Sequence, residues 1–265
     1  MTVPRPTRPT PPTAAPQAAR GAVKFGVTKG PCRKAWKLGI YAEHGVGKST
    51  LASLCEGAIF ADIEDSMVDL DVQRVTGIQS WSDLRAWVQQ QTDAGTVRGI
   101  DTLTSGQDMC ISHVIATKKQ DGTAATTSLE DYKYKAGARY VYDEFRLLLG
   151  DIEASYRRGV SWIMIAHDFV EWFRNPDDKD YKRHAPDLIE TKDYSIRLAW
   201  ARFCDHLAFI DRDIVVQKGK ASGGASRTIY MDGAPNRMCK MRGLAQDVYP
   251  WAQGDAGFWD LLRSE

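Results

Sequence analysis

Long apolar runs and paired cysteines are both missing from this sequence of 265 residues. No uninterrupted apolar stretch approaches the ~20 residues that a helix needs to cross a bilayer, and the N-terminus lacks the apolar segment of a secretory signal. The five cysteines are scattered and never form a CxxC pair, which argues against a disulfide framework and against a zinc site. We therefore expect a cytoplasmic protein with no membrane partner.

Acidic side chains are absent from the first 37 residues, whereas eight basic ones are present: Arg5, Arg8, Arg20, Lys24, Lys29, Arg33, Lys34 and Lys37. Because the net charge of the whole chain is +1, the remaining residues carry about −7, which is +1 minus +8. Residues 1–20 are also rich in proline, threonine and alanine and offer little to bury. We predict a disordered basic arm over residues 1–35 that meets a polyanion or an acidic neighbouring subunit. A solvated tail without a specific role is the alternative.

A phosphate-binding loop is indicated by the residues that follow the apolar stretch 38–41. The motif lies between a segment typical of a strand and one typical of a helix, which is the context such a loop requires. Gly45 and Gly47 let the backbone turn its N–H groups toward phosphate oxygens, and the helix adds the positive end of its dipole. Ala42 stands where the strict motif has glycine, a position that accepts a small residue. The nucleotide-binding candidates are Ala42, Glu43, His44, Gly45, Val46, Gly47, Lys48, Ser49 and Thr50.

The chemistry of this loop predicts a nucleoside triphosphate, taken to be ATP, together with Mg²⁺. Lys48 supplies a point charge to the β- and γ-phosphates, and the Ser49 hydroxyl is the expected Mg²⁺ ligand. Asp101 lies in the next strand candidate, residues 96–103, after an isoleucine and before a threonine. An aspartate in that place holds Mg²⁺ directly or through water. Ser49 and Asp101 are therefore the metal-binding candidates.

Two polar residues at further strand ends are candidates for catalysis. Glu64 lies in the acidic end of the segment 58–65, and in parallel sheets ligands gather at the carboxyl ends of strands. Glu64 would position the attacking water, with a solvated loop carboxylate as the alternative. His167 ends the buried-strand pattern of residues 160–166, where a polar side chain can sense the γ-phosphate. A capped strand-end histidine is the alternative. The following stretch, residues 169–192, is predicted to be a long functional or disordered loop.

Strand and helix patterns alternate from residue 36 onward. This alternation predicts an α/β fold in which helices flank a mostly parallel central sheet. Several short strand patterns after residue 206 predict antiparallel strands toward the C-terminal end. We expect the core domain to span residues 36–249 and a packed tail to span residues 250–265.

The order of these parts resembles the RecA-like P-loop ATPases. It is closest to phage-encoded members that consist of the core domain alone and serve single-strand annealing and recombination. The resemblance covers roughly residues 36–245 and is carried by the motifs at 42–49, 60–64, 100–102, 165–167 and 240–243. It implies that Glu64 activates the hydrolytic water and that His167 is the polar switch residue. It also implies that Lys240 and Arg242 reach the γ-phosphate of a neighbouring subunit, which requires a homo-oligomeric ring or filament.

The same resemblance implies that residues 118–136 and 169–192 bind single-stranded DNA. The expected function is therefore an ATPase that binds single-stranded DNA and promotes strand annealing or exchange in phage recombination, in the cytoplasm of a bacterial host. A single-strand-binding protein is a further expected partner. One alternative is a DNA-binding protein that is switched by nucleotide binding and hydrolyses the nucleotide negligibly. Another is a P-loop ATPase or small-metabolite kinase unrelated to DNA.

Overall fold

The computed structural model describes residues 26–27, 29, 35–118, 127–176, 178–217, 220–243 and 246–263. The chain divides into two compact units, Met1–Arg33 and Lys34–Glu265, and the following description concerns the second. The predicted disordered arm, residues 1–35, lies almost entirely outside the described residues.

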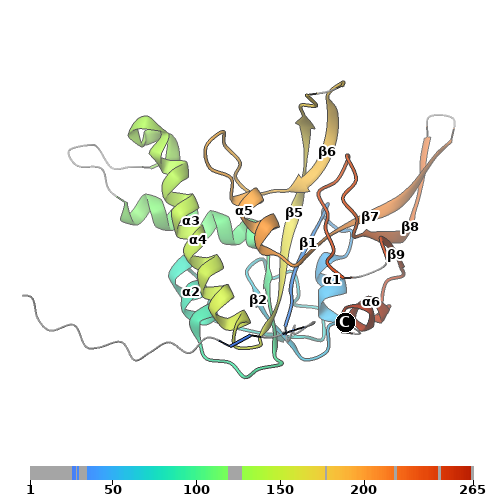
Figure 1. Ribbon diagram of the computed structural model, residues 1–265, viewed down its shortest axis with the longest axis horizontal. Helices are drawn as coiled ribbons and strands as arrows, with labels where there is room; N and C mark the ends of the chain where they lie inside the picture. Colours follow the sequence, from blue (N-terminus) through green and yellow to red (C-terminus); the bar gives the residue numbers. More distant parts are fainter. Residues whose placement is uncertain are drawn as a thin grey trace, which may run out of the picture. The chain divides into compact units, whose positions relative to one another are not determined.

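One sheet organises the second unit (Figure 1). In chain order its strands are β1 (Lys37–Ala42), β2 (Ala58–Asp62), β3 (Gln73–Arg74), β4 (Val97–Asp101), β5 (Ser161–Phe173), β6 (Tyr181–Pro186), β7 (His206–Gln217), β8 (Lys220–Tyr230) and β9 (Val248–Trp251). The strands lie side by side in the order β3-β2-β4-β5-β1-β7-β8-β9, with β6 paired to β5 alone. All neighbours from β3 to β7 are parallel, whereas β7, β8 and β9 pair antiparallel. This arrangement confirms the predicted fold class.

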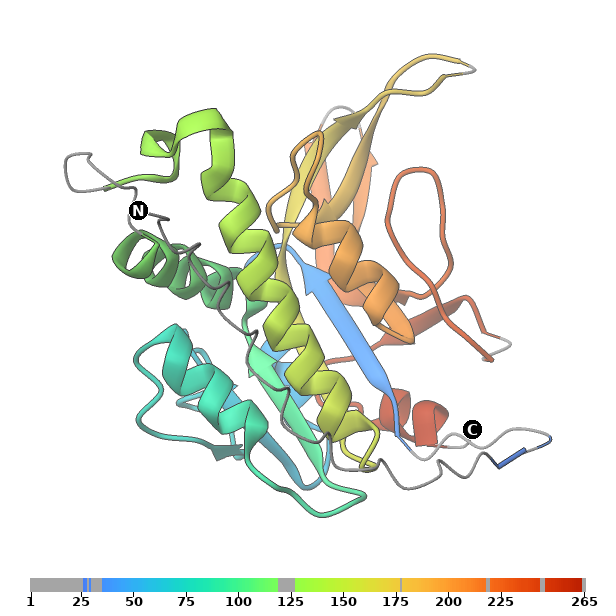
Figure 2. The same ribbon diagram turned by 60° about the vertical axis from the view of Figure 1, so that its left-hand side comes forward.

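Helices cover both faces of the sheet (Figures 1 and 2). One face carries α2 (Trp81–Gln89), α3 (Leu103–Thr117), α4 (Ala136–Tyr156) and α5 (Ile196–Phe203). The other carries α1 (Lys48–Ser53) and α6 (Gly257–Arg263). Each layer encloses its own apolar core against the sheet. Among the described residues, no helix is both long enough and apolar enough to cross a bilayer.

The central strands are buried because they carry apolar side chains on both faces. On β5, Trp162 and Met164 point into the core under α2 to α5, while Ile163 and Ile165 point into the core under α1 and α6. An unbroken apolar run is what a parallel strand needs when helices cover both of its faces. Because these strands pair in parallel, the carboxyl ends of β1, β2 and β4 lie beside His167 of β5 at one edge of the layered core.

Strand β4 is unusually polar for a buried strand, and two neighbouring contacts explain this. The guanidinium of Arg98 lies over the ring of Trp87, 3.9 Å from its centroid, and donates a hydrogen bond of 2.6 Å to the Trp87 carbonyl. Burial lowers the pKa of Arg98 to about 10, with the nearby Arg158 contributing. Gly99 faces Phe60 so closely that a Cβ atom would overlap the aromatic ring. The strand therefore keeps its place in the sheet despite its polar sequence.

The prediction of a loop at residues 169–192 is wrong for residues 169–173 and 181–186, which are strands. β5 continues past His167 to Phe173 and pairs antiparallel with β6, so that residues 168–173 and 181–186 form the two arms of a hairpin. Glu171 accepts a hydrogen bond of 2.6 Å from Arg183 on the opposite strand, and such cross-strand pairs stabilise a two-stranded ribbon. A second cross-strand pair joins His184 Nδ1 to the Asp168 carboxylate at 2.6 Å.

The other segment expected to bind DNA, residues 118–136, contains two short helical turns. Residues 119–126 lie outside the described residues. The 3-10 turns η1 (Leu129–Asp131) and η2 (Lys133–Lys135) lead directly into α4. Tyr132 between these turns is buried, and its hydroxyl donates a hydrogen bond of 3.0 Å to the Val114 carbonyl on α3. The segment expected to bind DNA therefore includes two short packed turns, and its DNA binding stays a prediction.

Candidate functional site

The predicted phosphate-binding loop connects the carboxyl end of β1 to the first turn of α1. Gly45 has a φ of 71° and Gly47 a φ of 113°, both in the left-handed region that favours glycine. A Cβ atom on Gly47 would also lie 3.1 Å from the ring of Trp251. Backbone conformation and close packing therefore both require glycine at position 47.

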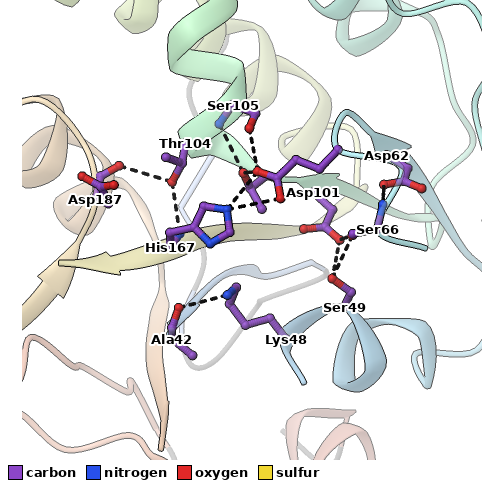
Figure 3. Close-up of polar contacts among 12 residues, drawn as sticks. Ala42, Lys48, Ser49, Asp62, Ser66, Asp101, Thr104, Ser105, His167 and Asp187 are labelled. Atoms are coloured by element: carbon purple, nitrogen blue, oxygen red, sulfur yellow. Dashed lines mark hydrogen bonds and ion pairs between the residues drawn. The ribbon is translucent and has the colours of Figure 1, made fainter. Parts of the chain in front are cut away.

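Lys48 is the most enclosed charged group of this loop. Its ammonium donates a hydrogen bond of 2.9 Å to the Ala42 carbonyl (Figure 3). It donates a second one of 3.1 Å to the Glu43 carbonyl. Burial lowers the pKa of Lys48, while the negative charges of Asp101 and Glu64 oppose that shift. The loop's own carbonyls thus hold the positive charge at the base of the loop, the place predicted for the β- and γ-phosphates.

The two metal-binding candidates are Asp101 at the end of β4 and Ser49 in α1, which follows β1. They come together because β5 pairs with both β4 and β1. The Oδ2 atom of Asp101 accepts hydrogen bonds of 2.6 Å from both the Ser49 and the Ser66 hydroxyls. Burial raises the pKa of Asp101, although these two hydroxyls counteract it. Its Oδ1 atom is buried and has no hydrogen-bond partner among the described residues. Ser66 was not predicted, because nothing in a turn sequence shows that it faces the next strand.

This arrangement of oxygens fits Mg²⁺. A hard divalent cation prefers carboxylate and hydroxyl oxygens, and the unpaired Oδ1 of Asp101 is a free ligand among them. Within the described residues, no group of three or more His, Cys, Asp or Glu could hold a metal by itself. Mg²⁺ would therefore be held by Asp101 and Ser49 together with phosphate oxygens, whose charge it would neutralise.

Glu64 lies in the turn after β2 and is the acceptor in a dense hydrogen-bond cluster. Its Oε1 atom accepts from the Ser105 hydroxyl at 2.6 Å, from His167 Nε2 at 2.9 Å and from the Thr102 hydroxyl. Burial alone would raise the pKa of Glu64, but the bonds from His167, Ser105 and Thr102 outweigh it and lower the pKa to about 2. The carboxylate is thus ionised at neutral pH and accepts only, so His167 Nε2 must carry the proton of their shared bond.

Thr102 and Ser105 were missed by the sequence analysis, although one signal was available. Thr102 is the N-cap of α3, and its side chain accepts from the Ser105 backbone N–H. A threonine before a helical pattern is a helix-start signal. That signal locates the two hydroxyls at the carboxyl end of β4, but only the β2–β4 pairing places them beside Glu64.

His167 joins three parts of the site. Its ring packs in a tilted arrangement against the ring of His44 in the phosphate-binding loop, with 4.1 Å between the centroids. Its backbone N–H donates to the Thr104 hydroxyl at 3.0 Å, and that hydroxyl donates to the Asp187 carbonyl beyond β6 at 3.2 Å. His167 therefore contacts the loop, the predicted water-positioning carboxylate and the segment that closes the β5–β6 hairpin. A switch residue needs such connections, and its predicted role stays a prediction.

Lys240 and Arg242 are not brought to this site. The Lys240 backbone pairs with Leu207, and the Arg242 guanidinium lies 3.6 Å from the Asp205 carboxylate, beside the start of β7. β7 is parallel to β1, so its start lies at the opposite end of β1 from the phosphate-binding loop. Within one chain these cations cannot contact the phosphates held by that loop. Their predicted action on a neighbouring subunit stays a prediction.

The predicted residues that do meet line one cleft of about 290 Å³. Its lining comprises His44, Gly45, Gly47, Lys48, Ser49, Thr50, Glu64, Ser66, Asp101, Thr102, His167, Arg227 and Gln253. Arg227 on β8 and Gln253 after β9 come from the far C-terminal part of the chain and were not predicted. No local motif marks them, because their place depends on the antiparallel strands folding back beside α1.

The chain is similar to a known protein family and to known structures. Residues 34–242 match the protein family described as AAA domain. Among curated protein sequences, none matches the chain. Among solved structures, the chain is similar to a KaiC-like protein from the hyperthermophilic archaeon Pyrococcus horikoshii, with 12% sequence identity and a TM-score of 0.44. That similarity covers 83% of this chain and 87% of the other.

Proposed function

The chain belongs to the AAA-domain family and is a P-loop ATPase, and on that premise we propose that it acts on single-stranded DNA. It binds ATP with Mg²⁺, assembles on single-stranded DNA and promotes strand annealing or exchange in phage recombination. Hydrolysis takes place at the interfaces of a ring or filament, where Lys240 and Arg242 reach the neighbour's γ-phosphate. A single-strand-binding protein supplies the DNA substrate.

The observation that carries this proposal is a pair of exposed aromatic side chains accompanied by cations. Trp172 on the β5–β6 hairpin is 68% exposed, and the Lys182 ammonium lies 5.7 Å from its ring centroid. Tyr134 in η2 is fully exposed and lies between Lys133 and Lys135 in the chain. Aromatic rings that stack on bases, beside cations that meet the backbone, are the usual means of binding single strands. The hairpin and the turns before α4 project on the same side in both views (Figures 1 and 2).

The path from the nucleotide site to this hairpin is short and direct. β5 runs without interruption from His167 to Trp172. The return strand is linked as well, because Thr104 hydrogen-bonds both the His167 backbone and the Asp187 carbonyl. A change at Glu64 and His167 on ATP binding would therefore shift the hairpin, which supports a DNA-binding segment that responds to the nucleotide.

Trp172→Ala tests the DNA interaction. We expect the wild type to hydrolyse ATP faster with single-stranded DNA, and the stimulation to fade as salt rises, because phosphate contacts release counterions. Loss of one stacked ring should weaken DNA binding about tenfold, within the range for base–aromatic stacking. The measurements are phosphate release across a salt series and fluorescence anisotropy of a labelled oligonucleotide.

Leu147→Ala, which removes an exposed apolar side chain from α4, is the matched control and should leave DNA binding unchanged. Turnover that is indifferent to DNA at every salt concentration, combined with unchanged oligonucleotide binding by Trp172→Ala, would contradict the proposal.

A second candidate function is a DNA-binding protein in which ATP acts as a switch and hydrolysis is negligible. The state of Glu64 favours it. A carboxylate with a pKa of about 2 is a weak base, and hydrogen bonds from three side chains occupy it. General bases work best when their pKa lies near the working pH. Under this alternative, Glu64 would report on the nucleotide without promoting attack by water.

Glu64→Gln separates the two candidates. If Glu64 positions the attacking water, the variant should bind ATP as the wild type does and lose about 10²-fold or more in turnover, the scale of acid–base contributions. If ATP is only a switch, turnover is already negligible in the wild type and ATP-dependent DNA binding persists in the variant. Asp65→Asn, which changes the exposed neighbouring acid, is the control and should retain wild-type turnover.

A further inference from the structure

Two arginines from the C-terminal strands contact the backbone of the phosphate-binding loop. The Nη2 atom of Arg212 on β7 donates to the Gly45 carbonyl, and the Nε atom of Arg227 on β8 donates to the Val46 carbonyl, each at 2.5 Å. Neither residue belongs to the loop motif, and each lies more than 160 residues from its partner in sequence. The two contacts fall on consecutive peptide units of the loop.

The two arginines are also direct cross-strand partners in the β7–β8 ladder. Like charges placed opposite each other on an antiparallel pair are normally destabilising. Here each guanidinium donates to a carbonyl oxygen of the same loop, so both positive charges are directed at that loop. The sheet therefore delivers two positive donors to one short segment of backbone.

A contact to a peptide carbonyl also fixes the direction of the N–H group in the same peptide unit. In a trans peptide the C=O and the N–H point in opposite directions. The Gly45 carbonyl shares its unit with the Val46 N–H, and the Val46 carbonyl shares its unit with the Gly47 N–H. A guanidinium that holds each oxygen thereby fixes each N–H on the opposite side. It also polarises the unit, which strengthens the N–H as a donor.

Trp251 on β9 supports the same part of the loop. Its buried ring packs against Gly47, and its indole N–H donates to the Asp255 carbonyl at 3.0 Å. The Arg227 guanidinium lies 5.6 Å from the centroid of that ring. The antiparallel strands β7, β8 and β9 therefore hold Gly45 to Gly47 by two charged hydrogen bonds and one aromatic contact.

We propose that Arg212 and Arg227 are positioning residues of the nucleotide site, which direct the Val46 and Gly47 N–H groups at the triphosphate. This inference rests on the proposed function, because it presupposes that the loop binds a nucleoside triphosphate. The arginines act through the loop backbone and stabilise bound ATP before and during hydrolysis alike. Their loss therefore weakens binding more than it slows the chemical step.

The test compares Arg212→Met, Arg227→Met and Arg227→Lys by ATP turnover and by binding of inorganic tripolyphosphate. We expect each methionine variant to raise the KM for ATP about tenfold, the scale of a hydrogen bond from a charged donor, with kcat within about twofold of the wild type. Tripolyphosphate affinity should fall by the same factor. Arg227→Lys keeps a charged donor for the single contact and should recover most of the loss.

Arg157→Met, which removes an exposed arginine paired to Glu153, is the matched control and should change none of these quantities. Thermal unfolding without ligand establishes that each variant is folded. Folded methionine variants with an unchanged KM overturn the inference, as does a loss confined to kcat. A wild-type protein that binds neither ATP nor tripolyphosphate would instead overturn the proposed nucleotide function itself, and this inference with it.

Discussion

Lys48→Ala is expected to abolish ATP turnover and to weaken ATP binding severely. The ammonium lies buried between the carbonyls of Ala42 and Glu43, close enough to Asp101 and Glu64 that their charges affect its pKa. Without it, backbone N–H groups alone would have to balance the phosphate charge, next to two carboxylates that repel it. Removal of a single preorganised donor costs about 10²–10³-fold in rate in other enzymes, and a buried cation should cost at least that much.

The measurements for Lys48→Ala are phosphate release and calorimetric titration with ATP, on protein whose folding is checked by circular dichroism. Arg157→Ala is the control, because Arg157 is an exposed cation at the end of α4. Wild-type turnover by a folded Lys48→Ala variant would refute the assignment of the phosphate-binding loop.

Arg242→Ala is expected to leave ATP binding intact while it lowers hydrolysis by about 10³-fold, the lower end of the effects of arginine fingers. Such a cation contributes most where negative charge develops during phosphoryl transfer. The side chain is 60% exposed and lies 3.6 Å from the Asp205 carboxylate, at the opposite end of β1 from the phosphate-binding loop. Its loss should therefore cost little stability, and an effect on hydrolysis would have to come from a neighbouring subunit.

Mixing experiments test that action between subunits. A Lys48→Ala subunit lacks a working loop but carries Arg242, whereas an Arg242→Ala subunit carries the loop but lacks the cation. Mixtures of the two should recover part of the activity that each lacks. Arg139→Ala is a close control, since Arg139 is 61% exposed and lies 3.6 Å from the Asp143 carboxylate. Absence of recovery at every mixing ratio would remove the support for action between subunits.

The β5–β6 hairpin illustrates where sequence patterns gave an incomplete prediction. The apolar run that ends at Ala166 correctly indicated a buried strand, but the polar residues after it were interpreted as a loop. Strand patterns are recognised by burial, and this extension leaves the core. Side-chain pairs stabilise its two strands, and the residues of one such pair, Glu171 and Arg183, are 12 positions apart in the sequence. No local pattern reveals which acid faces which base.

The sequence alone determined the phosphate-binding loop, the strands that lead to Glu64, Asp101 and His167, and the α/β fold class. These are local properties, because backbone conformation, capping and apolar periodicity depend on neighbours along the chain. Only the tertiary structure decided which side chains meet. The pairing of β2 with β4 placed hydroxyls on Glu64, and the return of β7 and β8 placed two arginines on the loop. Contacts between distant segments depend on strand order and register, which no single stretch of sequence encodes.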